Sequence, residues 1–303
     1  MRIKVNNNMH IKFFKKFIDL KLSKFILILI TEKPLGAFGF FITILLFFVG
    51  LFADYLAPYG INELHMSDRL LAPSTSYWLG TDNLGRDIFS RVIYGARVSL
   101  IVGLSVSIIA TVISISLGML SAYIGGKFDL IIQRFVDGFM CIPILIIIMV
   151  VISMLGQGLI QLIVIMGFSF GISGSRYSRG FALTIIQNTY IESAKAIGCS
   201  TSRILIFHVL PNILPLIIVG FTILLPGVIL MEAGLSFLGY GIPPPDPSWG
   251  GMLSGTNRSY MFLAPWMVIW PGFALSLVVF GTHMFGDAMR DLLDPRLKTS
   301  KHI

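Results

Sequence analysis

The sequence predicts an all-α integral membrane protein with six transmembrane helices and both chain ends on the same side of the bilayer. Hydrophobic residues make up 55% of the chain, only 13% of residues are charged, and the mean hydropathy is +0.84. A soluble domain carries about twice that fraction of charge. Long windows without charge and an uneven distribution of Lys and Arg complete the prediction.

Charge-free windows predict where the chain crosses the bilayer, because about 20 apolar residues are needed to span its hydrocarbon core. The predicted spans are Pro34–Ala53, Val98–Gly126, the two halves of Gly138–Ser175, Ile204–Met231 and Ser259–Gly286. A turn at Gly156-Gln157-Gly158 divides the third span from the fourth. The run Phe25–Ile30 is too short to span and is expected to lie at the membrane interface.

The positive-inside rule predicts that both termini are cytoplasmic. With six spans, 18 of the 23 Lys and Arg residues fall on the side of the termini. The net charge of +8 then follows from topology and from attraction to anionic membrane lipid. Nucleic-acid binding is not predicted, because the basic residues are scattered along membrane borders without interleaved aromatic residues.

The spans divide the chain into five predicted regions. These are a basic cytoplasmic tail (1–33), the first transmembrane helix (34–56), an external segment (57–97), a core of five helices (98–286) and a cytoplasmic tail (287–303). The N-terminus has no small-residue cleavage site, so the first span is predicted to be an uncleaved anchor. Cys141 and Cys199 are not expected to pair, since one lies in a span and the other on the reducing side.

A short polar insert, Tyr190–Pro211, separates two apolar runs and predicts a helix, a break and a second helix. Thr189 and Glu192 have the spacing of a capping box. Gly198 suits the left-handed residue that ends a helix, and Ser200 or Thr201 can cap the next one. Composition alone is equally compatible with a polar loop. A helical projection on one face of a membrane protein is typical of a docking element.

The insert resembles the EAA signature of ABC importer permeases. The matching residues are Glu192, Ala194, Gly198, His208, Leu210, Pro211 and Asn212, and Ser193 stands where Ala is usual. The resemblance implies a coupling helix at 189–203 that sits in a groove of a cytosolic ATPase. The residues expected to couple are Glu192, Ser193, Ala194, Lys195, Gly198, Arg203 and Pro211. Pro211 marks a kink or the entry into the bilayer, and Arg203 is expected to hold the helix at the membrane border.

Two external stretches carry further motifs. Trp78–Arg91 reads W-L-G-T-D-N-L-G-R-D-I-F-S-R, and 234–252 contains G-L-S-F-L-G-Y-G-I-P-P-P-D-P-S-W-G. From the residues alone, the first is a loop stitched by surface Asp–Arg pairs of little energetic value. The second is a stiff proline-rich loop whose aromatic residues Phe237, Tyr240 and Trp249 lie at the headgroups.

Both stretches, and the tail from Gly286 to Arg296, look like motifs of the oligopeptide, dipeptide and nickel importers, in their second or C-type permease. The motif residues are Gly80, Thr81, Asp82, Gly85, Arg86, Asp87, Gly239, Pro244 and Trp249.

This resemblance implies the type I permease fold and alternating access in the cytoplasmic membrane of a bacterium. The implied partners are a homologous second permease, two cytosolic ATPase subunits and an external substrate-binding protein. The chain itself is expected to be neither an enzyme nor a cofactor protein, with ATP and Mg on the ATPases. Its Gly126-Lys127 pair lacks the rest of a phosphate-binding loop. Peptides are favoured over nickel, because the histidines are dispersed and no metal site is predicted.

An ion-coupled secondary transporter is the main alternative. Such carriers place carboxylates or paired charges in the middle of the membrane. In this chain Asp54, Asp137, Glu232 and Asp287 all fall near the predicted ends of spans.

A rhomboid-like intramembrane protease is a more distant alternative. Gly171-Ile172-Ser173-Gly174 and His283–Gly286 resemble the Ser–His dyad of that family. The second span, however, offers no His or Asn as oxyanion helper. Both candidates also lie at cytoplasmic ends. ABC permeases often have aromatic residues where this chain has Gly171 and Gly174, which predicts a looser fourth span at its cytoplasmic end.

Overall fold

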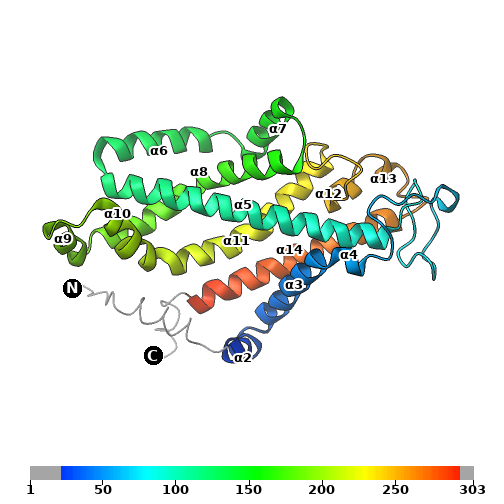
Figure 1. Ribbon diagram of the computed structural model, residues 1–303, viewed down its shortest axis with the longest axis horizontal. Coiled ribbons are helices and arrows are strands. Elements are labelled where there is room, and N and C mark those ends of the chain that lie inside the picture. The colour runs from blue at the N-terminus through cyan, green and yellow to red at the C-terminus, as the bar shows by residue number, and fades with distance from the viewer. Residues whose placement is uncertain (1–21, 294–303) are drawn as a thin grey trace.

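The computed structural model describes residues 22–293, which form a bundle of helices without a β-sheet in that range (Figure 1). Five helical segments are long and apolar enough to cross a membrane, or six if one bent pair forms a single span. The longest helices are α3 (Pro34–Leu51), α5 (Ile88–Ile124), α8 (Leu159–Ile186), α11 (Leu210–Phe237) and α14 (Trp266–Leu293). The predicted all-α class is therefore confirmed, with five or six candidate membrane spans.

Shorter helices occupy the two ends of the bundle and the connections. They are α2 (Leu22–Glu32), α4 (Ala53–Leu56), the 3-10 turn η1 (Met66–Asp68), α6 (Gly126–Met140), α7 (Ile144–Leu155), α9 (Thr189–Ala196), α10 (Thr201–Ile204), the π-helical segment η2 (Leu205–Val209), α12 (Trp249–Met252) and α13 (Gly255–Ser259). Helices α9 and α10 lie at one end, here named the α9 end. The loop 57–87 lies at the opposite end, here named the loop end (Figure 1).

Small residues allow the long helices to approach backbone to backbone, as is common in membrane bundles. A Cβ at Gly39 would lie 2.3 Å from the carbonyl oxygen of Gly281, where α3 crosses α14. A Cβ at Gly118 would lie 2.6 Å from the carbonyl oxygen of Ser175, where α5 packs on α8. These contacts bring α3 close to α14 and α5 close to α8.

The third span differs from its prediction. Instead of one continuous helix from Gly138, α6 and α7 meet at an 85° bend across residues 141–143. Helix α7 has 12 residues, about 18 Å of helix, which is too short for a core of about 30 Å. The charge-free window excluded α6 because it carries Asp129 and Asp137, which arginines of α8 neutralise. The turn at 156–158 is confirmed, with Gly156 at φ +90°.

Several helices extend beyond the predicted windows. Helix α5 begins at Ile88 rather than Val98, because Arg91 and Arg97 find partners within the protein. Helix α14 continues past Gly286 to Leu293. Within the predicted N-terminal tail, α2 buries Leu29 against the end of α14. Residues 1–21 and 294–303 of the two predicted tails lie outside the described residues.

Two apolar clusters hold the bundle together. The loop-end cluster joins α5, α7, α8 and α11 through Val102, Val106, Ile148, Ile152, Leu162, Ile165, Met166, Val228, Leu235 and Ile242. The α9-end cluster joins α5, α8, α9 and the start of α11 through Met119, Ala122, Ala182, Ile191, Ala194, Ile204, Leu205, Val209, Ile213 and Ile217. The short helix α9 is therefore packed against the long helices.

Candidate functional site: a helical projection and a buried loop latch

Helix α9 is fixed on one face and open on the other. Ile191 and Ala194 are buried in the α9-end cluster, whereas Glu192 and Ser193 are exposed. Ile197, just after the helix, is 81% exposed. Because the inner face is packed, α9 projects as a rigid element.

The end of α9 has the geometry predicted for Gly198. This residue has φ +81°, and its N–H donates to the carbonyl of Lys195 at 3.0 Å. The N–H of Cys199 donates to the carbonyl of Ala194, also at 3.0 Å. These two bonds form a Schellman motif. The Ser200 hydroxyl accepts from the N–H of Arg203 at 3.4 Å, which confirms it as the cap of α10.

The predicted capping box at the start of α9 is wrong. Thr189 is the first helical residue, Asn188 precedes it, and no side chain caps the helix there. The amide of Asn188 donates instead to the carbonyls of Thr184 and Ile185, so it closes the end of α8. With only Gln187 and Asn188 between the two helices, the available polar group serves α8. The side chain of Lys195 lies over the ring of Tyr123 at 4.7 Å and adds a cation–π contact to α5.

Pro211 lies where the helix geometry changes. The turn before it is π-helical, and the N–H of Leu210 donates to the carbonyl of Leu205. A proline has no N–H and clashes with the carbonyl four residues before it, so the preceding turn widens. The predicted kink thus takes the form of a π segment in a helix that runs on to Phe237. The exposed Arg203 lines a surface hollow of about 520 Å³ together with Ile206 and Phe207.

A larger groove of about 820 Å³ opens between α5, α8, α11 and α14. Its lining combines apolar residues with small hydroxyl and glycine residues, among them Thr111, Ser114, Ser173, Gly174, Ser178 and Gly220. Gly174 faces this groove, but Gly171 does not loosen the helix as predicted. A Cβ at Gly171 would lie 2.7 Å from that of Ile113, so this glycine brings α8 close to α5.

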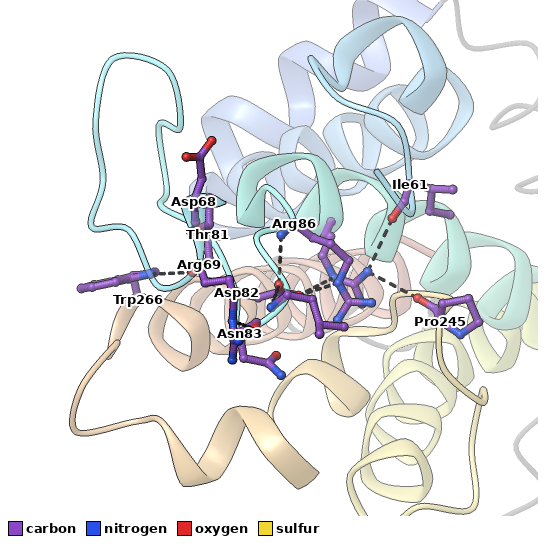
Figure 2. Close-up of polar contacts among 11 residues, drawn as sticks. Ile61, Asp68, Arg69, Thr81, Asp82, Asn83, Arg86, Pro245 and Trp266 are labelled. Atoms are coloured by element: carbon purple, nitrogen blue, oxygen red, sulfur yellow. Dashed lines mark hydrogen bonds and ion pairs between the residues drawn. The ribbon is translucent and has the colours of Figure 1, made fainter. Parts of the chain in front are cut away.

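At the loop end, Asp82 is the centre of a buried polar latch (Figure 2). Its side chain is 1% exposed and accepts from the N–H groups of Leu84 at 2.8 Å and Arg86 at 3.0 Å. It also pairs with Nε of Arg86 at 2.6 Å, while Nε of Arg91 lies 3.9 Å away. The expectation of weak surface pairs is therefore wrong, because both arginines are largely buried with the carboxylate.

The latch connects three separate parts of the chain. Arg91 donates to the carbonyls of Ile61 at 3.5 Å and Pro245 at 3.3 Å. The indole N–H of Trp266, at the start of α14, donates to the carbonyl of Thr81 at 3.1 Å (Figure 2). The latch, defined as Thr81, Asp82, Arg86 and Arg91, thus joins the loop 57–87, the proline-rich loop and α14.

The glycines and aspartate of the same motif shape the entry into α5. Gly80 and Gly85 have φ +80° and +74°, and a Cβ at Gly85 would lie 1.8 Å from the carbonyl oxygen of His65. Asp87 caps α5 by accepting from the N–H of Ser90 at 2.8 Å. Gly80, Gly85 and Asp87 therefore serve the local backbone.

Trp249 does not lie at the headgroups as predicted. It is 2% exposed, and its N–H donates to the carbonyl of Val92 at 3.0 Å. A Cβ at Gly95 would meet the indole ring at 2.7 Å, so only glycine leaves room for it. Gly239 has φ +83° just after the end of α11, and Pro244 is exposed in the loop that follows.

Surroundings shift the pKa of titratable groups outside the spans, among them Tyr77 and Asp54. Burial, together with the hydrogen bond to Asp68, raises the pKa of Tyr77 to about 12. This tyrosine therefore stays a neutral donor to Asp68 at 2.9 Å. The Arg97 guanidinium, bound in a fork, lowers the pKa of Asp54.

The sequence and the fold agree with one known family. Residues 110–299 match the family described as "Binding-protein-dependent transport system inner membrane component". The chain belongs to this family. It is 39% identical over 264 residues to the glutathione transport system permease protein GsiD of Pectobacterium atrosepticum, covering 87% of each chain. It is 38% identical to the dipeptide transport system permease protein DppC of Alkalihalophilus pseudofirmus, covering 88% of each chain. The probable D,D-dipeptide transport system permease protein DdpC of Escherichia coli is also 38% identical, over 87% of this chain and 88% of its own.

Membership of this family identifies the chain as a multi-pass permease component of ABC importers, and the family's role is transport. The predicted ABC permease of the peptide type is thereby confirmed at the level of the family.

The sequence did not predict the ion pairs between α6 and α8. Asp129 pairs with Arg179, and Asp137 with Arg176. The partners lie 39 and 50 positions apart in the sequence, and a single sequence carries no signal that pairs residues at such distances.

The latch yields a stability prediction. Asp82→Ala leaves two buried arginines without their carboxylate, and breaking a buried pair costs about 3–5 kcal/mol. We expect a clearly lower melting temperature of the purified protein in detergent. The matched control is Asp54→Ala, which removes an exposed partner of Arg97 and is expected to change the melting temperature little. Equal shifts of the melting temperature in the two variants would show that the latch stabilises the protein no more than the exposed Asp54–Arg97 pair does.

Proposed function

We propose that this chain is the C-type permease subunit of an ATP-driven importer of small peptides. The observation that carries the proposal is its identity of 38–39% to permeases of glutathione and dipeptide systems over nearly the whole chain. These relatives are named for short peptides, which favours peptides over the nickel alternative. Residues 22–293 contain no group of three His, Cys, Asp or Glu side chains that could hold a metal ion.

The proposed orientation has the α9 end in the cytoplasm. It follows from the excess of Lys and Arg on that side. Helix α14 runs from the loop end toward that same end (Figure 1). The proposed location is the cytoplasmic membrane of a bacterium.

The proposed partners are a homologous second permease, two cytosolic ATPases that carry ATP and Mg, and an external binding protein. In this arrangement, α9 with the exposed Glu192 and Ile197 seats in an ATPase.

The proposed mechanism is alternating access driven through α9. Closure of the ATPase dimer displaces α9. Because Ile191 and Ala194 are packed against α5, α8 and α11, the displacement passes to these long helices. Rigidity of the projection matters, since a soft connection would absorb the motion. Gly198 contributes by ending α9 sharply, so that α10 can return the chain to the bundle.

The groove between α5, α8, α11 and α14 fits a pathway for varied peptides. Its hydroxyl groups can hydrogen-bond to a peptide backbone, and its apolar walls do not select for one type of peptide side chain. A lining of this kind binds substrate weakly. Selection among peptides then rests with the external binding protein.

The substrate can be tested by uptake. We expect the complex, reconstituted in liposomes with its ATPases, second permease and binding protein, to take up labelled dipeptide or glutathione only with ATP. Uptake of Ni²⁺ but not peptide would favour the nickel alternative. Uphill uptake by this chain alone, driven by an ion gradient, would contradict the proposal and favour a secondary transporter.

Gly198→Val tests the role of α9. A β-branched residue in the left-handed region costs at least 1–2 kcal/mol (order of magnitude) and would unwind the end of the helix. We expect transport and substrate-stimulated ATP hydrolysis of the assembled complex to fall several-fold. Gly198→Asn is the control, because Asn tolerates this conformation, and it should keep most of the activity. Normal stimulation in Gly198→Val would remove α9 from the mechanism.

Ser173→Ala separates transport from proteolysis. Ser173 lines the groove, but its hydroxyl donates to the carbonyl of Ser169 at 3.0 Å within its own helix, so its proton is not available to a peptide. We expect uptake within a factor of about two of the unchanged protein, since removing one such bond costs only about 1 kcal/mol. A proteolytic activity that disappears in this variant would favour the rhomboid-like alternative.

A further inference from the structure

Helix α6 is held to the bundle by charge rather than by apolar packing. Only Val136 of this helix is buried, while Leu130, Ile131 and Phe135 point outward and are exposed. A helix normally docks through its apolar stripe. Here the face that meets the bundle carries Asp129 and Asp137.

The strongest contact of α6 is a three-helix clamp around Asp129. Its two carboxylate oxygens accept from Nε of Arg179 in α8 at 2.7 Å and from Nη2 at 2.6 Å. The hydroxyl of Ser121 in α5 also donates to Asp129, and Gln133 donates to this hydroxyl at 3.2 Å. The side chains of Arg179 and Asp129 are 28% and 18% exposed. A bidentate pair this shielded fixes both distance and orientation.

The clamp lies on the part of α8 that leads toward α9. Arg179 is about two turns before α8 ends at Ile186, and α9 begins at Thr189. The α9-end cluster packs α5, α8 and α9 together over these same turns. The clamp therefore attaches α6 to the packed end of the bundle that carries α9.

Helix α7 belongs to the other end. Ile148 and Ile152 are buried in the loop-end cluster with residues of α5, α8 and α11. Between α6 and α7 the chain bends by 85° at residues 141–143. Helix α7 is thus packed in the loop-end cluster, whereas the clamp attaches α6 to α5 and α8 nearer the α9 end, and the bend lies between them.

We propose that Asp129 and Arg179 are positioning residues for transport, because their clamp makes α6 follow α9 while the bend at 141–143 absorbs the motion relative to α7. The inference rests on the proposed coupling of α9 to an ATPase. Without the clamp, α6 keeps only the more exposed Asp137–Arg176 pair and little buried apolar surface to hold it on α8. Movement of α9 would then reach α8 but pass only weakly to the third span.

The first test measures coupling in the assembled complex. Arg179→Met keeps the length of the side chain and removes its charge, and Asp129→Asn removes the other charge. We expect both to lower substrate stimulation of ATP hydrolysis about five-fold or more, with assembly and unstimulated hydrolysis retained. Arg179→Lys, which keeps the charge but loses the fork, should lie between these variants and the unchanged protein.

Two further variants separate coupling from a merely structural role. The exchange Asp129→Arg with Arg179→Asp should restore most of the stimulation. Arg134→Met is the control, because Arg134 is 76% exposed and 3.8 Å from Asp137, and it should behave like the unchanged protein. Normal stimulation in both single variants would overturn the proposal. Loss of assembly in both that the exchange does not repair would also overturn it, since the pair would then serve folding alone.

A distance measurement tests the motion itself. Spin labels are placed at the exposed Ile131 in α6 and Met154 in α7, after replacement of Cys141 and Cys199. We expect the label distance to change when ATP and vanadate trap the complex, and to stay unchanged in Arg179→Met. An unchanged distance in a complex that transports peptide would refute the clamp and leave the proposed function standing. A complex without ATP-dependent peptide uptake would instead refute the function.

Discussion

Ion pairs within this bundle hold separate segments together, and the arrangement of the helices depends on that pairing. A lone carboxylate or guanidinium away from water is expensive. Asp82 therefore gathers Arg86 and Arg91 at the loop end, and Asp129 gathers Arg179 near the α9 end. Each pair joins segments distant in the sequence or stiffens a loop. The pairs thus act as fixed points between which apolar packing and close helix contacts fill the space.

The two ends of the bundle are built differently. At the loop end, buried hydrogen bonds from Arg91, Trp249 and Trp266 tie loops to long helices. At the α9 end, apolar packing holds a short helix whose outer face stays open, with Ile197 exposed. A loop end held by hydrogen bonds and a projecting α9 end are consistent with a subunit that a partner moves from its α9 end. In the proposed mechanism the projecting helix α9 transmits motion to the bundle, so the packing behind it is as important as its exposed residues.

Several local features could be predicted from neighbouring residues alone. The end of α9 at Gly198, the cap at Ser200 and the turn beginning at Gly156 depend on a few adjacent residues and their backbone preferences. The start of α9 was predicted wrongly because the side chain of Asn188 could serve either of two helices. Such competition between neighbouring elements has no signature in the order of residues.

The sequence by itself determined that this is a helical membrane protein of the permease family, because hydropathy, charge bias and motifs are properties of the chain in order. Only the tertiary structure decided that the third span is broken, that Trp249 is buried and that Asp82 lies in a closed latch. It also decided that α6 is held by Asp129. Each of these outcomes depends on a partner far away along the chain. From the sequence alone, a charged residue is predicted to lie outside the membrane interior. Folding can nevertheless bury it by placing a residue of opposite charge beside it.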